Sequence, residues 1–341
     1  MSRPTVHDIA KEAGVSLATV DRVLNARPGV RDKTIAKVQA AVARLGYVRD
    51  ASAANLARQR QYKFAFVLPD GPSQFTDTLK VALRETYASQ IADRVSVKVV
   101  GIPTHDAHAI VRALLSFDPK RLDGVAIMVP ETPQVRDAVH RLKDAGMAVV
   151  TLASDLPNSE RDYFIGINNV AAGKTAGQLM GRFVGAQGEV LVVTNSLRSR
   201  DSLERRLGFD EVMAGDFPRV SVLPSVESYD DSLRMEEIVL EVIMRRPRLA
   251  GVYSMGFGNR SLLNALRRSG ALDDLIVIAH EITPVTKQAL VQNEISAVIT
   301  QNVGHLVRSA LRVLRSLCDD MPIFDAQERI RIDVVLRENL P

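Results

Sequence analysis

The stretch TVHDIAKEAGVSLATVDRVLN (residues 5–25) predicts two short helices joined by a tight turn. In its first half, apolar residues recur at helical spacing and would form one stripe on a helix: Val6, Ile9, Ala10 and Ala13. Gly14 follows directly, where a helix commonly ends in a left-handed residue, and Ser16 stands where an N-cap is expected. Helices this short bury little alone, so we expect them to pack at a steep angle on a third.

The second helix of this stretch would have two unlike faces. Its apolar face carries Val20, Val23 and Leu24. The opposite face carries a mixed set of side chains: Leu17, Ala18, Asp21, Arg22 and Asn25. Burying the first face turns the second outward, which is the arrangement of a helix-turn-helix whose second helix enters the major groove of DNA. A helical hairpin inside an ordinary core is the alternative, and the small residues at the turn argue against it.

The charge distribution supports a contact with DNA. Residues 1–62 contain eleven Lys or Arg and five Asp or Glu, a net charge of +6. The whole chain carries +4, so the remainder carries −2. Positive charge is therefore concentrated on the part of the chain that would bind phosphates.

A third helix and a linker follow. Residues 32–45 predict a helix with Asp32 as its N-cap, ended by Gly46. Its inward face would consist of Ile35, Val38, Val42 and Leu45. Residues 49–62 are polar and basic and predict a linker, in which Leu56 is the only bulky aliphatic residue. The simplest role for Leu56 is packing on a neighbouring domain.

Length and composition bound the rest of the chain. With 341 residues, two or three domains are expected, and 46% hydrophobic with 25% charged residues is typical of a soluble globular protein. The single Cys318 excludes an internal disulfide and a cysteine-clustered zinc site. The first twenty residues lack an apolar signal segment, and the longest apolar run, residues 147–153, is too short to span a bilayer. We therefore expect a cytoplasmic protein with no membrane partner.

From residue 63 the pattern changes to strands alternating with helices. Seven strand-like runs stand at 64–68, 95–101, 124–129, 148–153, 189–194, 250–255 and 274–280. Helical patterns lie between them, for example at 135–145 and 171–184. This alternation predicts an α/β fold of parallel sheets with helices on both faces, and the strand count favours two doubly wound lobes. Such folds bind ligands at the carboxyl ends of their strands.

Residues 5–25, continued by ARLGYVRDASAANLA (residues 43–57), resemble the headpiece of the lac repressor and galactose repressor (LacI/GalR) family, without gaps over about sixty residues. The remainder is similar in order to that family's sugar-binding core, a periplasmic-binding-protein type I fold like that of ribose-binding proteins. The resemblance implies a headpiece at 1–48, a hinge at 49–62 and a core at 63–341. Lobe one would comprise about 63–161 and 301–322, and lobe two about 162–300 and 323–341. The segments 163–180 and 295–314 would mark the crossings, and a strand at 330–336 would complete lobe two.

The resemblance also implies roles on the DNA face. Leu17, Ala18 and Arg22 match the base-reading positions, and an arginine there can donate two bonds to guanine. Residues at phosphate-contacting positions are Thr5, Ser16, Thr19 and Asn25. Asp21 departs from the family's usual serine, and it would need to pair with a neighbour such as Arg22 or to accept from a cytosine amine.

In the family, a leucine at the place of Leu56 wedges into the minor groove of operator DNA from a hinge helix. The proline that commonly precedes that helix is replaced here by Arg49 and Asp50. The implied partners are a second copy of the chain, forming a homodimer, and a near-palindromic double-stranded operator.

Polar and aromatic residues after the strands predict a cleft for a sugar or polyol. Matching the family's ligand positions are Ser73, Phe75, Arg205 and Gln301, and the loop 254–261 adds Phe257 and Asn259. Glu281 stands where the family generally carries aspartate, and Asp155 lies about two residues after the family's usual aspartate. Three of them have a simpler alternative, since Phe75 can be core, Asp155 can cap a turn and Arg205 can lie on a solvated helix face. Gly256 and Gly258 form GxG, but Ser261 replaces the third glycine of a dinucleotide motif, so no cofactor is expected.

No motif for catalysis stands out. GxSxG, HExxH and a Walker A sequence are absent, and the six histidines are scattered, so neither an enzyme nor a metal site is expected. The sequence therefore favours a DNA-binding transcriptional regulator, a repressor of carbohydrate or polyol genes, whose operator affinity a sugar-like effector controls. One alternative is a non-catalytic sugar sensor or transport-type sugar-binding protein. The other is an α/β enzyme with an accessory DNA-binding domain.

Overall fold

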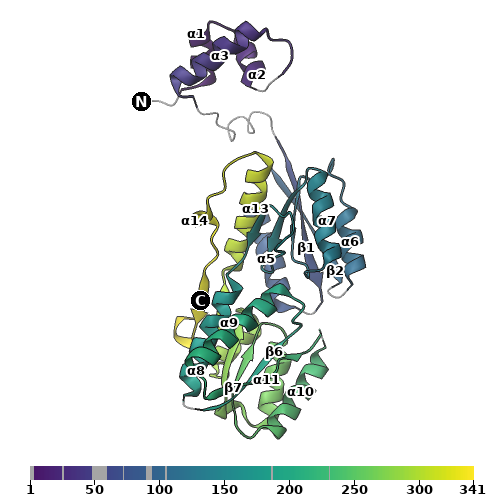
Figure 1. The fold of residues 1–341 in the computed structure, drawn as a ribbon, viewed down its shortest axis with the longest axis vertical. Helices are drawn as coiled ribbons and strands as arrows, with labels where there is room; N and C mark the ends of the chain where they lie inside the picture. Colours follow the sequence, from purple (N-terminus) through teal and green to yellow (C-terminus); the bar gives the residue numbers. More distant parts are fainter. Residues whose placement is uncertain are drawn as a thin grey trace. The chain divides into compact units, whose positions relative to one another are not determined.

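The computed structural model describes residues 4–24, 27–47, 60–71, 73–89, 94–103, 106–185, 187–229 and 231–341. The chain forms two compact units, Met1–Arg60 and Gln61–Pro341, each of which has its own core. Figure 1 shows the helices of the first unit and the two α/β lobes of the second. The predicted hinge helix, with Leu56 and Asp50, and the predicted contact of Asn25 lie outside the described residues.

The first unit is a three-helix headpiece: α1 (Val6–Ala13), α2 (Leu17–Leu24) and α3 (Asp32–Leu45). Thr5 and Asp8 form a capping box at the start of α1, in which the Thr5 amide donates to Asp8 Oδ2 over 2.8 Å. Gly14 and Gly46 end α1 and α3 in the left-handed region, with φ of 64° and 60°. The core of fully buried side chains joins all three helices and consists of Ile9, Val20, Val38 and Ala41. The three predicted helices are confirmed, and so are Gly14 and Gly46 as the ends of the first and the third.

The assignment of Asp32 as an N-cap was wrong. Asp32 is the first residue of α3, and Arg31 occupies the cap position without a side-chain bond to the helix. Asp32 instead places a carboxylate in the first turn, where the positive end of the helix dipole favours a negative charge.

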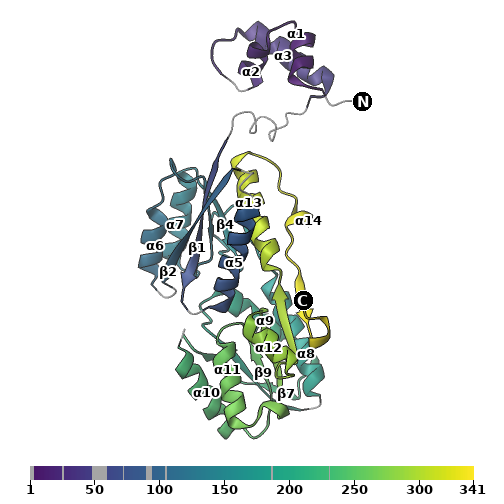
Figure 2. The same cartoon turned by 180° about the vertical axis from the view of Figure 1, so that it is seen from behind.

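The first lobe of the second unit is built on a parallel sheet in the order β2-β1-β3-β4-β5. Its strands are β1 (Tyr62–Asp70), β2 (Val95–Pro103), β3 (Gly124–Ile127), β4 (Ala148–Leu152) and β5 (Tyr163–Ile165). Helices α6 (Ala107–Leu115) and α7 (Pro133–Asp144) cover one face of this sheet, and α5 (Gln74–Ser89) and α13 (Val303–Cys318) cover the other (Figures 1 and 2). The long apolar runs of its strands follow from burial on both faces.

The second lobe has a sheet in the order β12-β11-β10-β9-β6-β7, and β8 pairs with β6. Its strands are β6 (Gly188–Thr194), β7 (Val220–Val222), β8 (Val226–Glu227), β9 (Leu249–Ser254), β10 (Ile276–His280), β11 (Ala297–Gln301) and β12 (Ile332–Val335). The helices are α8 (Asn169–Val184), α9 (Arg200–Asp216), α10 (Ser232–Arg245), α11 (Asn259–Ser269) and α12 (Pro284–Val291). Only β12 runs antiparallel to its partner among the described pairings. All seven predicted strands and the final one are confirmed.

The predicted limits of the lobes need correction. β5 pairs with β4 through Val150 and Tyr163, so residues 163–165 complete the first sheet instead of beginning the second lobe. Gln301 ends β11 in the second sheet, so the chain returns to the first lobe one residue later than predicted. After α13, a segment with α14 (Asp325–Glu328) leads back to β12. The chain therefore crosses between the lobes three times.

Candidate nucleic-acid interface and interlobe cleft

The outward face of α2 is open to solvent, as predicted. Leu17, Ala18 and Arg22 are exposed, and Leu17, a large apolar side chain, keeps 42% of its surface accessible. Val20 on the opposite side is fully buried against α1 and α3. The packing of the headpiece thus presents the three proposed base-reading side chains together.

The start of α2 is held by its own hydroxyl groups. Ser16 Oγ accepts from the Thr19 amide over 3.2 Å and lies 2.9 Å from Thr19 Oγ1. This confirms Ser16 as the cap of the helix. Asp21 forms an ion pair with a neighbouring residue, Arg27, whose Nη1 lies 3.2 Å from Asp21 Oδ2. Because Arg27 is its partner, Asp21 leaves the Arg22 guanidinium available on this face.

In the second unit, a cavity of about 140 Å³ lies between the lobes. A single water needs roughly 10–15 Å³ by the same measure, so the space suits a molecule on the order of ten heavy atoms. Strand ends supply its walls, as expected for open α/β sheets. Of the eight predicted effector residues, six line it: Ser73, Phe75, Arg205, Phe257, Glu281 and Gln301.

A buried polar cluster forms the second-lobe wall of this cavity. Arg205 is 4% exposed, Glu281 5% and Gln301 3%. Gln301 Nε2 donates to Glu281 Oε1 over 3.0 Å, and Arg205 Nη2 lies 3.6 Å from the same oxygen. Arg205 Nη1 also lies 3.9 Å from Asp201 Oδ2, so two carboxylates balance the guanidinium charge. Charged groups buried this deeply persist when they are paired in this way.

The backbone conformation and the pKa of Glu281 both depart from their usual values. Its backbone adopts φ of 67°, a conformation rare for a side chain of this size, directly after β10. Burial raises the pKa of Glu281, while the positive charge of Arg205 and the bond from Gln301 oppose the rise. Glu281 therefore reaches the cavity from a strained loop.

Close packing of α8 against α9 positions Arg205. A side chain at Gly173 would place its Cβ 2.0 Å from the backbone oxygen of Arg205, so only glycine fits there. This approach brings Asn169, at the start of α8, to Arg205, whose Nε donates to Asn169 Oδ1 over 2.9 Å. Arg205 Nη1 donates to the Met255 carbonyl over 2.8 Å. Arg205 is thus fixed from three elements, which rules out the alternative of a solvated helix face.

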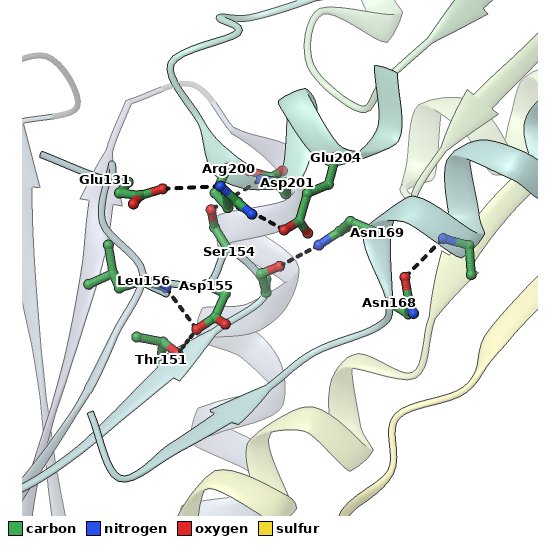
Figure 3. A network of polar contacts seen from close by, with 12 residues as sticks. Glu131, Thr151, Ser154, Asp155, Leu156, Asn168, Asn169, Arg200, Asp201 and Glu204 are labelled. Atoms are coloured by element: carbon green, nitrogen blue, oxygen red, sulfur yellow. Dashed lines mark hydrogen bonds and ion pairs between the residues drawn. The ribbon is translucent and has the colours of Figure 1, made fainter. Parts of the chain in front are cut away.

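Two predicted effector residues, Asp155 and Asn259, are not among the residues that line the cavity. Asp155 accepts from Thr151 and from the Leu156 amide (Figure 3). It also accepts from Arg161 Nη2 over 2.6 Å, so it stabilises the turn after β4. Its neighbour Ser154 lines the cavity instead.

Asn259 stands behind the cavity wall and does not line it. Its Oδ1 accepts from Ser254 Oγ over 2.6 Å, and its Nδ2 donates to the His280 carbonyl over 3.3 Å. It thus supports the loop that carries Phe257 and the strand that ends before Glu281.

The cavity also contains residues that the sequence did not single out, including Thr76, Asp201 and Ser202. Thr76 Oγ1 and Gln301 Oε1 are buried and have no hydrogen-bond partner among the described residues. One belongs to each lobe, and buried polar atoms normally find a partner. Thr76 lies one helical turn after Ser73. Asp201 lies in the arginine-rich segment 197–209, which the sequence pattern marks by its basic residues.

Two of the contacts that join the lobes beside the cavity come from the start of α9 (Figure 3). Arg200 Nη1, at the start of α9, lies 3.7 Å from Glu131 Oε2 in the loop after β3. The Asp201 amide donates to Ser154 Oγ over 3.4 Å. Arg200 Nε also donates to Glu204, and that bond raises the pKa of Arg200, so it stays charged. These contacts hold the lobes together around the cavity.

Within the described part of the chain, no group of three or more His, Cys, Asp or Glu side chains is arranged to bind a metal ion. The helices in that part are all too short or too polar to cross a membrane.

Each of the two units matches the model of a known protein family. Residues 64–320 match the model of the periplasmic binding protein domain, and residues 5–50 match that of the bacterial regulatory proteins of the lacI family. Together they define a class of protein in which a DNA-binding headpiece precedes a ligand-binding core. The chain belongs to the lacI family of bacterial regulatory proteins, as the resemblance of its headpiece indicated.

Individual relatives are more distant. The chain is 28% identical over 165 residues to catabolite control protein A of Priestia megaterium, a match that covers 47% of this chain and 48% of that protein. It is 22% identical over 340 residues to the HTH-type transcriptional regulator pepR1 of Lactobacillus delbrueckii subsp. lactis, covering 98% and 97%. A solute-binding protein of an ABC transporter from Burkholderia graminis, solved with D-arabinose, has a TM-score of 0.74 and 24% identity over 86% of this chain and 98% of that one. At this identity the likeness shows the fold alone.

Proposed function

We propose that this regulator is a cytoplasmic, non-catalytic repressor of genes for carbohydrate or polyol use. In this proposal, a sugar-sized effector binds in the interlobe cleft and changes the affinity of the headpiece for operator DNA. The effector role rests on one observation at Gln301, which lines the cavity. Its buried Oε1 has no hydrogen-bond partner among the described residues.

The cavity has the chemistry to bind hydroxyl groups. Arg205 supplies donors, Glu281, Asp201 and Gln301 supply acceptors, and Phe257 offers an apolar surface for ring carbons. Phe75 offers a second such surface from the first lobe. Since the Arg205 charge is already balanced by two carboxylates, an uncharged molecule with several hydroxyls fits better than an anion.

On the DNA side, Leu17 and Ala18 would contact bases through apolar surface and Arg22 through hydrogen bonds to guanine. Thr5, Ser16 and Thr19, with Asn25, would contact phosphates, and Leu56 would enter the minor groove. A homodimer would place two headpieces on two half-sites, so the operator would be a near-palindrome.

The proposed control is thermodynamic linkage. The effector contacts both lobes, so it stabilises one arrangement of them over another. Operator affinity then shifts by the difference in effector affinity between the two arrangements.

A ligand screen tests the cleft assignment. Pentoses, hexoses, polyols and inositols are added to the full chain, stabilisation is followed by thermal shift, and binding is measured by calorimetry. We expect one class to bind with a 1:1 stoichiometry per chain and Gln301→Ala to weaken that binding at least about tenfold, the effect of losing one good polar contact. Gln292→Ala, an exposed glutamine outside the cavity, is the matched control and should bind as the wild type does. Equal affinity of the wild type and Gln301→Ala would reject the cleft.

A further inference from the structure

Helix α13 begins beside the cavity, and its other end lies beside Tyr62, the first residue of β1. Gln301, which lines the cavity, immediately precedes the cap Asn302, whose side chain accepts from the His305 amide over 2.7 Å. The helix spans 16 residues, so it is about 24 Å long. Its buried side, which includes Leu306, Ala310 and Leu314, packs on the first sheet and beside α5 (Figure 2). A helix packed along its whole length acts as a rigid element.

At the far end of α13, Asp319 binds the first residue of β1. The Tyr62 hydroxyl donates to Asp319 at 2.9 Å from Oδ1 and 2.7 Å from Oδ2. The guanidinium of Arg315 lies 5.5 Å from the centre of the Tyr62 ring. Tyr62 is only 2% exposed, and burial together with Asp319 raises the pKa of its hydroxyl, so the donor proton is retained at neutral pH.

Neighbouring bonds reinforce this junction. The Lys63 amide donates to Asp123 Oδ2 over 2.7 Å, and Cys318 Sγ lies 3.8 Å from the Asp123 carbonyl oxygen. The first two residues of β1 are therefore tied to the last turn of α13 and to the residue before β3.

The headpiece unit ends at Arg60 and the larger unit begins at Gln61, so Tyr62 is the second residue of the larger unit. The first residues of β1 therefore lie next in the chain to the segment that leads to the headpiece. We propose that the Tyr62–Asp319 pair is a positioning contact for allosteric control, through which the state of the cavity at Gln301 reaches the linker by way of α13. This proposal rests on the proposed effector control of DNA binding.

The test compares two tyrosines of the first sheet, Tyr62 on β1 and Tyr163 on β5. Tyr62→Phe removes only the hydroxyl that binds Asp319. Tyr163→Phe is the matched control, because the Tyr163 hydroxyl donates to Asp325 over 2.8 Å in a similar Tyr–Asp pair on β5. For each full-length protein, the dissociation constant for a selected operator is measured with and without the effector identified by the thermal-shift screen, and the effector affinity is measured by calorimetry.

We expect Tyr62→Phe to bind the effector within about twofold of the wild type, while the ratio of its two operator constants falls at least about fivefold toward one. Tyr163→Phe should keep the wild-type ratio. Asp319→Ala, which removes the acceptor instead of the donor, should reproduce the result of Tyr62→Phe. A purely structural role would lower the melting temperature without separating effector affinity from the operator response.

The outcomes distinguish this inference from the proposed function. If the wild type binds an effector but its operator affinity does not change, the proposed control fails and the inference fails with it. If the wild type responds and Tyr62→Phe responds equally, the inference alone is overturned.

Discussion

Replacing Arg205 by leucine tests whether the buried charge cluster of the cavity is held together by this one cation. The change deletes the bonds of Arg205 to Asn169 and to the Met255 carbonyl. It also leaves Glu281, which is 5% exposed, with its charge buried and uncompensated.

The magnitude follows from these contacts. Breaking a buried ion pair by removing one partner costs about 3–5 kcal/mol, a figure that already includes the orphaned charge. Since about 1 kcal/mol shifts the melting temperature by roughly 2–4 °C in domains of this order of size, Arg205→Leu should lower it by at least about 6 °C. Adding Glu281→Gln to Arg205→Leu should recover part of the loss, because the buried charge is then removed.

Calorimetric melting of the full chain at two pH values measures the effect. Burial already raises the pKa of Glu281, and without Arg205 it rises further. A carboxyl whose folded pKa lies above its unfolded value binds more protons in the folded state, so its contribution to stability falls as pH rises. The fall in melting temperature that Arg205→Leu causes, measured against the wild type at the same pH, should therefore be larger at pH 7 than at pH 5. A shift under about 2 °C, or no recovery in the double variant, would refute the reasoning.

Three further predictions concern other residues. Arg22→Ala should weaken binding to the selected operator by about 1–3 kcal/mol and leave binding to random DNA nearly intact, as measured by anisotropy, and equal losses on both would reject base reading. Burial and Arg205 hold the pKa of His280 well below 6.5, so the folded wild type loses stability as pH falls below that value. Calorimetric melts of His280→Gln between pH 7.5 and 5.5 should show a smaller fall, and a fall as large as that of the wild type would argue against a buried neutral imidazole. Glu131→Gln, which removes the contact with Arg200 across the lobes, should weaken effector binding by up to about fivefold in calorimetry. Glu211→Gln, which loses an ion pair within the second lobe, should not, and a loss as large there would show that the effect is not specific to the lobe contact.

Much of the architecture was predictable because burial dictates it. Parallel strands covered on both faces must be nearly continuous apolar runs, and each such run in the sequence became a strand. Gly14 and Gly46 marked helix ends because the left-handed region costs glycine little. Glu281 and Gln301 could be placed in the cleft because each lies at the carboxyl end of its strand.

The remaining features depend on packing that no local pattern contains. Ser154 lines the cavity and Asp155 does not, because a shift of one residue in the turn after β4 points the side chain elsewhere. The place of residues 163–165 is set by pairing with β4, and a three-residue strand has no period to reveal it. Asp201 was hidden among arginines, and only the fold of α9 brings it to Arg205.

The central claim is that one molecule links a DNA-binding face to a ligand cleft. The most direct test is a titration of fluorescently labelled operator DNA, selected from a random pool, with the wild-type protein in the absence and presence of the saturating effector. The linkage predicts that the dissociation constant changes by about 5- to 150-fold. An unchanged constant, with calorimetry showing the effector bound, would contradict it.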